Sequence, residues 1–204
     1  MKKFELTAES KINIFGKKLF RIKALISFGS VKEGETGGWV EKEENLNQSG
    51  NAWVSGNAEV SGNAWVSGNA EVYGNAKVFG NAWVSGNAKV FGNAWVYGDA
   101  KVSGNAEVYG NAKVSGNAEV SGNAWVYGDA KVFGNADYTT IHGFGTQFRT
   151  TTFFRCKDKK VRVACECFFG NIPEFREQVK NTRKGKIAEE YLMIADLMEK
   201  HFEK

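Results

Sequence analysis

Three cysteines in the last third of the chain are the first residues whose types and spacing point to chemistry. Cys165 and Cys167 stand two residues apart, so both thiols face one side of an extended segment, and Cys156 is placed to lie on a neighbouring strand. With His142 or His201 they would form a Cys3His zinc site. The pair lacks the separation by two intervening residues that is typical of zinc-binding cysteines, so ordinary buried thiols are the better interpretation. The sequence therefore predicts no metal site and no cofactor.

A second cluster with chemical potential lies just before these cysteines. The glycine-rich segment 143–146 leads into a threonine run that is flanked by arginines. Backbone N–H groups, hydroxyls and guanidinium groups are the donors with which proteins hold phosphate. The cluster is a candidate site for an anion or a nucleotide, and the alternative is a plain connection into a strand. The candidate residues are Arg149, Thr150, Thr151, Thr152 and Arg155.

The cysteines and the arginine- and threonine-rich cluster follow a long segment of six-residue repeats, which must hold them in place. The phrase Gly-Asn/Asp-Ala-x-Val-x occurs fourteen times without a break from Gly50 to Phe133, and a fifteenth copy at 134–139 diverges. Six residues cannot enclose a core, so each unit must be one side of a coil that stacks on its neighbours. Ala and Val stand two apart and are constant, so they face inward, and the variable residue between them faces outward. Gly with Asn or Asp supplies the corner, because these residues tolerate a left-handed backbone.

This pattern resembles the hexapeptide repeat of left-handed parallel β-helices, in which three hexapeptides make one triangular coil. The resemblance implies an 18-residue register, a left-handed sense and about five coils, in a column about 24 Å tall at one strand spacing per coil. The predicted fold class is mainly β: a left-handed parallel β-helix at 50–139, an N-terminal β cap at 1–49 and a small C-terminal α+β domain at 140–204.

The 18-residue register stacks the outward side chains into columns. Two corners of the column carry aromatic residues, whereas the third carries only Ser and Thr. Exposed aromatic surface marks an interaction site, and stacked rings also stabilise adjacent coils; the two interpretations are compatible. The first predicts burial against sister chains or a partner. The candidate interface residues are Trp53, Tyr73, Phe91, Tyr109, Tyr127, Phe79, Trp95, Tyr97 and Phe133.

Both ends of the column need caps, because an open strand edge would pair with another chain. In the N-terminal cap, residues 4–6, 12–15 and 19–22 are predicted to be short strands with a hairpin turn at 16–18, and residues 37–40 resemble the repeat imperfectly.

The C-terminal domain is predicted to combine a strand hairpin with two helices. Residues 150–155 and 161–165 form the strands, joined by a charged turn. Asn171 caps a helix that runs to about Asn181, and a second helix begins at about Lys186 after a glycine.

Flanking segments resemble those of phage and prophage hexapeptide-repeat proteins, loosely described as polymer-forming and mostly without an assigned activity. This resemblance implies a viral accessory origin and supplies no catalytic residues. An odd number of clustered cysteines favours reduced thiols, which fits a bacterial host cytoplasm, and no segment has the composition of a signal peptide or a membrane span. The segments concerned are 4–6, 22–25, 37–40, 150–154, 167–170 and 190–192.

Acyltransferases are the best-known enzymes on this prism, and they resemble one another in a catalytic His between adjacent subunits. His142 lies just past the last coil, and the repeats contain neither a His nor an interrupting loop. A structural His142 is therefore the better interpretation.

The distribution of charge completes the functional expectation. The formal charge is +2 over residues 1–49, −2 over 50–139 and +4 over 140–204, without the long basic stripe of a nucleic-acid binder. We therefore expect a non-enzymatic interaction or scaffold protein, a trimer or dimer without membrane association, that binds a host component. Counter-defence by sequestering a protein or a nucleotide signal is the specific hypothesis. The alternatives are a virion structural protein and an atypical acyltransferase.

Overall fold

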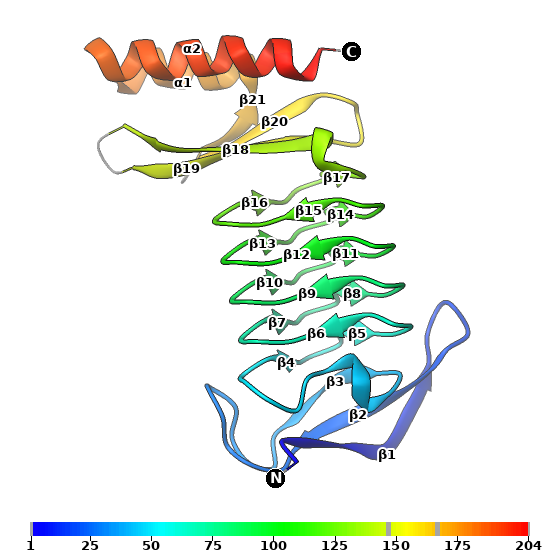
Figure 1. Ribbon diagram of the computed structural model, residues 1–204. Helices are drawn as coiled ribbons and strands as arrows, with labels where there is room; N and C mark the ends of the chain where they lie inside the picture. The colour runs from blue at the N-terminus through cyan, green and yellow to red at the C-terminus, as the bar shows by residue number, and fades with distance from the viewer. Residues whose placement is uncertain (1, 146–147, 166–167, 204) are drawn as a thin grey trace.

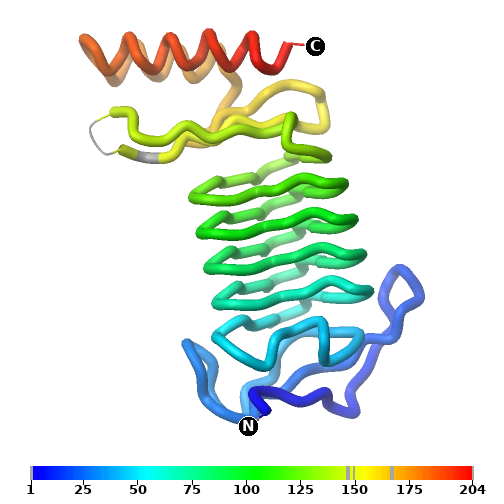
Figure 2. The backbone as a smooth tube through the Cα atoms, in the orientation of Figure 1, coloured from blue at the N-terminus to red at the C-terminus, as the bar shows by residue number. Residues whose placement is uncertain are grey.

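The computed structural model describes residues 2–145, 148–165 and 168–203. The chain forms a column of stacked coils that carries a β cap at one end and an antiparallel sheet under two helices at the other (Figure 1). The two ends of the chain lie at opposite ends of this column (Figure 2). The mainly β class, with a parallel solenoid of about five turns and a C-terminal α+β unit, is confirmed. The left-handed sense stays a prediction.

Each complete hexapeptide forms a two-residue strand followed by a bend. Strand partners are 18 residues apart, as in the pairs Trp53 with Glu71 and Glu71 with Lys89, which confirms the predicted register. The strands are β4 (Trp53–Val54), β5 (Glu59–Val60), β6 (Trp65–Val66), β7 (Glu71–Val72), β8 (Lys77–Val78), β9 (Trp83–Val84), β10 (Lys89–Val90), β11 (Trp95–Val96), β12 (Lys101–Val102), β13 (Glu107–Val108), β14 (Lys113–Val114), β15 (Glu119–Val120), β16 (Trp125–Val126) and β17 (Lys131–Val132).

The interior of the column contains the constant residues of the repeat. Every Val of the fourteen units is 0% exposed, and every Ala is at most 1% exposed. The corner glycines from Gly50 to Gly128 have φ between 61° and 75°, the left-handed region that the repeat predicts. At the corners, Asn side chains donate to the Asn 18 residues later at 2.9–3.4 Å. Amide ladders outside and aliphatic ladders inside therefore hold the coils in register.

The fifteenth hexapeptide does not form a coil side. Asn135–Asp137 form a 3-10 helix, η2, and Tyr138 begins the strand β18 (Tyr138–Phe144). Here Tyr replaces the constant Val, and Gly134 has φ −163° instead of a left-handed value. The coils therefore end with β17, and the divergent fifteenth copy at 134–139 leads into the C-terminal sheet.

The N-terminal cap extends one of the three solenoid sheets. β1 (Phe4–Ile12) and β2 (Lys18–Ala24) are antiparallel, β3 (Thr36–Val40) joins β2, and β3 also pairs in parallel with β5; the 3-10 helix η1 (Glu43–Asn45) follows. Residues 13–15, predicted as strand, lie in the hairpin turn instead. The Asn13 side chain accepts the N–H groups of Phe15 and Lys17, both at 2.9 Å, and this bends the chain early.

The C-terminal unit is a four-stranded antiparallel sheet with two helices. Its strands are β18, β19 (Arg149–Arg155), β20 (Val161–Cys165) and β21 (Phe168–Asn171), and its helices are α1 (Ile172–Thr182) and α2 (Gly185–Phe202). The predicted hairpin and helices are confirmed, including the Asn171 cap, which accepts the Glu174 N–H at 2.8 Å. β18 and β21 were not predicted. Within the described residues, neither helix combines the length and apolar character needed to cross a membrane.

Candidate binding surfaces

One corner of the solenoid carries a continuous column of aromatic rings. Tyr73, Phe91, Tyr109 and Tyr127 stack face to face, with centroids 4.7–4.8 Å apart and interplanar angles of 3–6°. This spacing equals the distance between neighbouring strands, so each coil contributes one ring. Tyr127 also contacts Phe169 of β21 at 4.5 Å. We call these five residues the aromatic strip.

The aromatic strip presents ring edges to the surface. Its four solenoid rings are half-buried because each covers the face of the next, whereas Phe169 is 43% exposed. Burial raises the pKa of Tyr73 and Tyr109, and raises that of Tyr127 to about 12, so the phenols stay neutral. The strip is therefore one uncharged surface that runs from the repeats into the C-terminal sheet.

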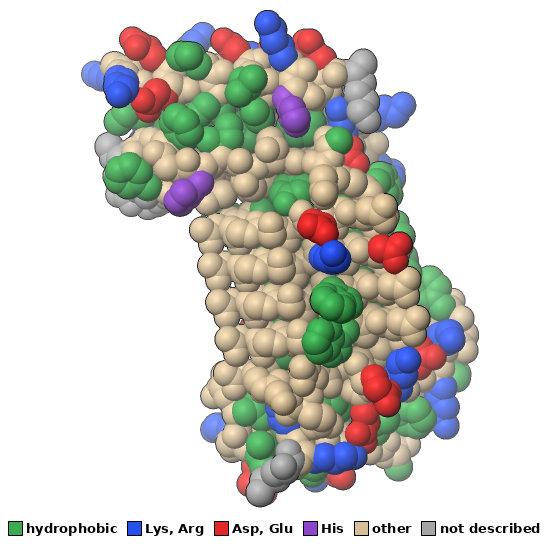
Figure 3. All heavy atoms as spheres, in the orientation of Figure 1, with side chains coloured by type: hydrophobic (Ala, Val, Ile, Leu, Met, Phe, Trp, Pro, Cys, Tyr) green, Lys and Arg blue, Asp and Glu red, His purple; other side chains and the backbone are tan. Residues whose placement is uncertain are grey.

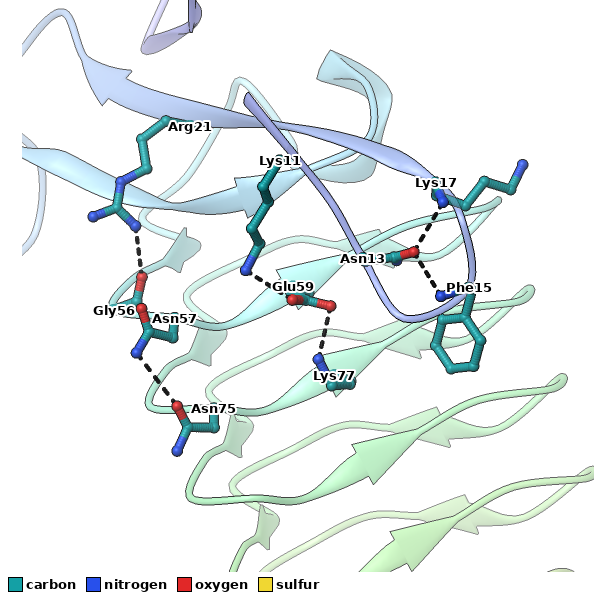
Figure 4. Close-up of polar contacts among 10 residues, drawn as sticks. All are labelled: Lys11, Asn13, Phe15, Lys17, Arg21, Gly56, Asn57, Glu59, Asn75 and Lys77. Atoms are coloured by element: carbon teal, nitrogen blue, oxygen red, sulfur yellow. Dashed lines mark hydrogen bonds and ion pairs between the residues drawn. The ribbon is translucent and has the colours of Figure 1, made fainter. Parts of the chain in front are cut away.

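The second aromatic corner is partly covered by the chain itself. Phe79 and Tyr97 stack at 5.0 Å. Phe15, from the hairpin turn, contacts Phe79 at 4.7 Å and Trp95 at 6.1 Å, beside the coils in Figure 4. Phe133 lies two coils beyond Tyr97, past a serine, and is 51% exposed. The rings of this corner are therefore interrupted at Ser115, whereas the aromatic strip is continuous.

Trp53 is not a surface residue. Its ring is 5% exposed and lies edge-on against Phe4 at 6.4 Å and Phe28 at 5.4 Å. The N-terminal cap covers the first coil at this position, so the predicted exposure of Trp53 is corrected.

The third side of the solenoid carries a separate aromatic pair. Trp65 and Trp83 contact each other edge to face at 5.1 Å, and Trp83 is 47% exposed. On the face shown in Figure 3, most of the solenoid is tan, because asparagine, serine and backbone atoms form its corners, while hydrophobic side chains gather over the C-terminal helix and sheet.

Polar side chains complete the open edge of the first coil. Lys3, Arg21 and Asn45 donate to backbone carbonyl oxygens of this coil at 2.8–3.1 Å. Burial lowers the pKa of Lys3 to about 8. Glu59, on the same coil, accepts from Lys11 and Lys77 at 2.8 Å each, which ties β1 to the first two coils (Figure 4). Sequence reasoning missed these residues. Among them only Asn45 lies just before the first repeat, where a polar side chain is a signal for a cap.

Side-chain acceptors satisfy the last coil, whereas side-chain donors satisfy the first. The backbone N–H groups of Glu119, Trp125 and Phe133 donate to side-chain oxygens of Asn135, Thr152 and Asp137 at 2.7–3.1 Å. Within the column, corner N–H groups donate to carbonyls of the next coil, so the first coil presents free acceptors and the last coil free donors. The two caps therefore match the polarity of the column.

The predicted anion-binding run does not converge on one point. Thr151 and Thr152 are buried, and Thr151 Oγ1 lies 3.2 Å from the Cys165 sulfur. Thr150 contacts His142 Nδ1 at 3.2 Å, and only the backbone of Arg149 is described. Thr146 lies outside the described residues. Anion binding by this run as a whole stays a prediction.

Arg155 and Phe133 line a large cleft. Arg155 comes from the predicted anion-binding residues and Phe133 from the predicted interface residues. The cleft has a volume of about 730 Å³ and lies between the last coil and the C-terminal sheet and helix. Arg155 pairs with Asp137 at 3.4 Å and donates to the Phe202 carbonyl at 2.6 Å. The lining residues are Lys131, Phe133, Asp137, Arg155, Cys156, Lys157, Lys159 and Phe202. Sequence reasoning missed this site, because its residues come from three separate segments.

Cys156, Cys165, His142 and His201, the cysteines and histidines that the structure describes, do not gather into a metal centre. Cys156 is buried, and burial raises its pKa to about 11, while Cys165 is half-buried and Cys167 lies outside the described residues. His142 and His201 are exposed. Among the residues that the structure describes, no three His, Cys, Asp or Glu side chains are placed to hold a metal ion.

A scan against models of known protein families finds no match for this chain, and a search of curated proteins finds no significant one.

Proposed function

We propose that this chain is a non-enzymatic binding protein that self-associates and engages a partner through the aromatic strip. The observation that carries the proposal is the continuity of five rings across the joint between the repeats and the C-terminal sheet. Aromatic side chains are enriched at the centres of protein interfaces, because they bury much apolar area at a low entropy cost.

The solenoid suits this role because it fixes the spacing of the rings. Tyr73, Phe91 and Tyr109 each directly follow a strand that is paired on both sides, and Tyr127 follows β16 at the end of the same sheet. The Val before each of these four rings is fully buried. A rigid, pre-ordered surface loses little conformational freedom on association. The proposed homo-oligomer is a trimer or a dimer that buries the strip.

The resemblance of the flanking segments to phage and prophage hexapeptide-repeat proteins supports a viral origin within this proposal. In that setting the partner would be a host component of the bacterial cytoplasm, sequestered as counter-defence. A virion structural role is the second candidate, and presence in purified virions would favour it. An atypical acyltransferase would require transfer activity that is lost in His142→Ala.

The oligomeric state tests the proposal directly. We expect light scattering after size exclusion to give a dimer or trimer for the native chain and a monomer for the triple variant Tyr73→Ser, Phe91→Ser and Tyr109→Ser. The matched control is Trp83→Ser, which removes an exposed ring from another side and should leave the oligomer intact.

Capture of partners from a host extract distinguishes self-association from partner binding. If the triple variant remains folded but loses both the oligomer and a specifically retained host protein, the strip serves both. A native chain that is monomeric and retains no partner would refute the proposal. Circular dichroism of every variant excludes loss of fold as the cause.

A further inference from the structure

The cleft beside Arg155 is lined by an excess of positive charge. Lys131 comes from β17 at the top of the column, and Lys157 and Lys159 come from the turn between β19 and β20. Lys157 and Lys159 are exposed, and Lys131 is half-buried. Two distant segments therefore contribute three lysines to the lining of one cavity.

These lysines lack carboxylate partners in the part of the chain that the structure describes. The lining carboxylate, Asp137, pairs with Arg155 and accepts the Phe133 N–H at 3.0 Å. In the same turn, Asp158 pairs with Arg162 at 2.7 Å. The lining of the cleft thus combines Lys131, Arg155, Lys157 and Lys159 with one carboxylate, Asp137, and keeps a net positive charge that attracts anions.

An exposed aromatic ring stands beside this charge. Phe133 is 51% exposed and makes no ring stack within the described residues. It follows Lys131 by two positions, so both side chains leave the strand on the same side. A base stacks favourably on such a ring, and hydrogen bonds between ammonium groups and phosphate are among the strong ones.

We propose that this cleft binds a nucleoside phosphate, with the phosphate held by Lys131, Lys157 and Lys159 and the base stacked on Phe133. The volume of about 730 Å³ lies within the range of small-ligand sites, about 300–1,000 Å³. The inference deepens the proposed binding function by naming a ligand class, and it assumes only that the protein acts by binding. The site is separate from the aromatic strip.

Calorimetric titration of the full chain tests this site with ADP and GDP as nucleotide probes, pyrophosphate as the phosphate alone and adenosine as the base alone. We expect the nucleotides to bind, and pyrophosphate and adenosine to bind at least about tenfold more weakly, because each makes half of the contacts. The variant Lys131→Gln/Lys157→Gln should weaken nucleotide binding about 10- to 100-fold. Phe133→Ser should weaken it about tenfold while leaving pyrophosphate binding unchanged.

Lys89→Gln, which removes a charge from the middle of the solenoid, is the matched control and should bind ADP normally. No heat with either nucleotide, or an unchanged affinity in the double lysine variant, overturns the proposal. Equal affinities for pyrophosphate and ADP would overturn the stacking of the base and leave a bare phosphate site. The Tyr73→Ser, Phe91→Ser and Tyr109→Ser variant should retain ADP binding, so failure of the strip and failure of the cleft give different results.

Discussion

Two glycines on the same corner of the solenoid allow the contact between coils to be measured separately from backbone strain. Gly104 and Gly122 both have φ +67°. A Cβ on Gly104 would lie 2.9 Å from the backbone N and O of Gly122, whereas a Cβ on Gly122 would meet nothing within 4 Å. Alanine at either site therefore incurs the same left-handed strain, but only at Gly104 must the next coil move.

The expected magnitudes follow from this difference. A left-handed alanine costs roughly 1–2 kcal/mol, partly offset by about 0.4–1 kcal/mol from the stiffer unfolded chain, so Gly122→Ala should cost about 1 kcal/mol. Overpacking adds roughly 1–3 kcal/mol in Gly104→Ala. For a chain of this size, 1 kcal/mol lowers Tm by about 2–4 °C. We therefore expect Gly104→Ala to melt about 2–12 °C below Gly122→Ala.

Thermal melting followed by circular dichroism, with urea midpoints as a second measure, tests this expectation. Gly86→Ala serves as a replicate, because its Cβ would lie 2.9 Å from the Gly104 carbonyl oxygen. Equal melting temperatures for Gly104→Ala and Gly122→Ala would refute the close stacking of corners on which the register depends.

Two further predictions concern the N-terminal cap. Asn45→Ala leaves the half-buried Gly62 carbonyl and the buried Ala64 carbonyl without their side-chain donor. We therefore expect a loss of about 1–3 kcal/mol in urea unfolding and larger species in light scattering, and an unchanged urea midpoint would contradict the capping role. For Glu59, burial would raise the pKa, but hydrogen bonds from Lys11 and Lys77 outweigh it and hold the pKa below its usual value. Its stabilising contribution is therefore present at neutral pH and lost as the pH falls below about 4. In Glu59→Gln, the free energy of unfolding should fall less steeply with decreasing pH in this acid range. A fall as steep as that of the native chain would argue against the pairing of Glu59 with the two lysines.

The repeat made most of the fold predictable. The inward alternation of Ala and Val, with a glycine at every corner, determines strand positions and core from Gly50 to Val132, and the resemblance to the hexapeptide repeat of β-helices supplied the 18-residue register. The fifteenth unit deviated because Tyr138 cannot replace a core Val in so narrow an interior. The outcome there depended on side-chain size, which a pattern of residue classes does not capture.

The candidate surfaces were only partly predictable. Stacking within the aromatic strip follows from the register, because residues 18 apart occupy adjacent coils. The burial of Trp53 and the cover over Phe79 depend on where Phe28 and Phe15 fold back, and these long-range contacts have no local signature. The basic cleft likewise exists only once Lys131 and the turn with Lys157 lie side by side.

The backbone groups that each cap satisfies belong to the adjacent end coil, and this gives the column a modular length. Duplication or loss of three hexapeptides would shift the two termini by one strand spacing, about 4.8 Å, and would preserve their rotational phase. Loss of a single hexapeptide would instead turn the C-terminal sheet by one side of the triangle relative to the N-terminal cap, while Phe169 would keep its contact with Tyr127 of the last coil. The number of hexapeptides therefore sets both the distance between the two caps and the rotation of one cap relative to the other about the axis of the column.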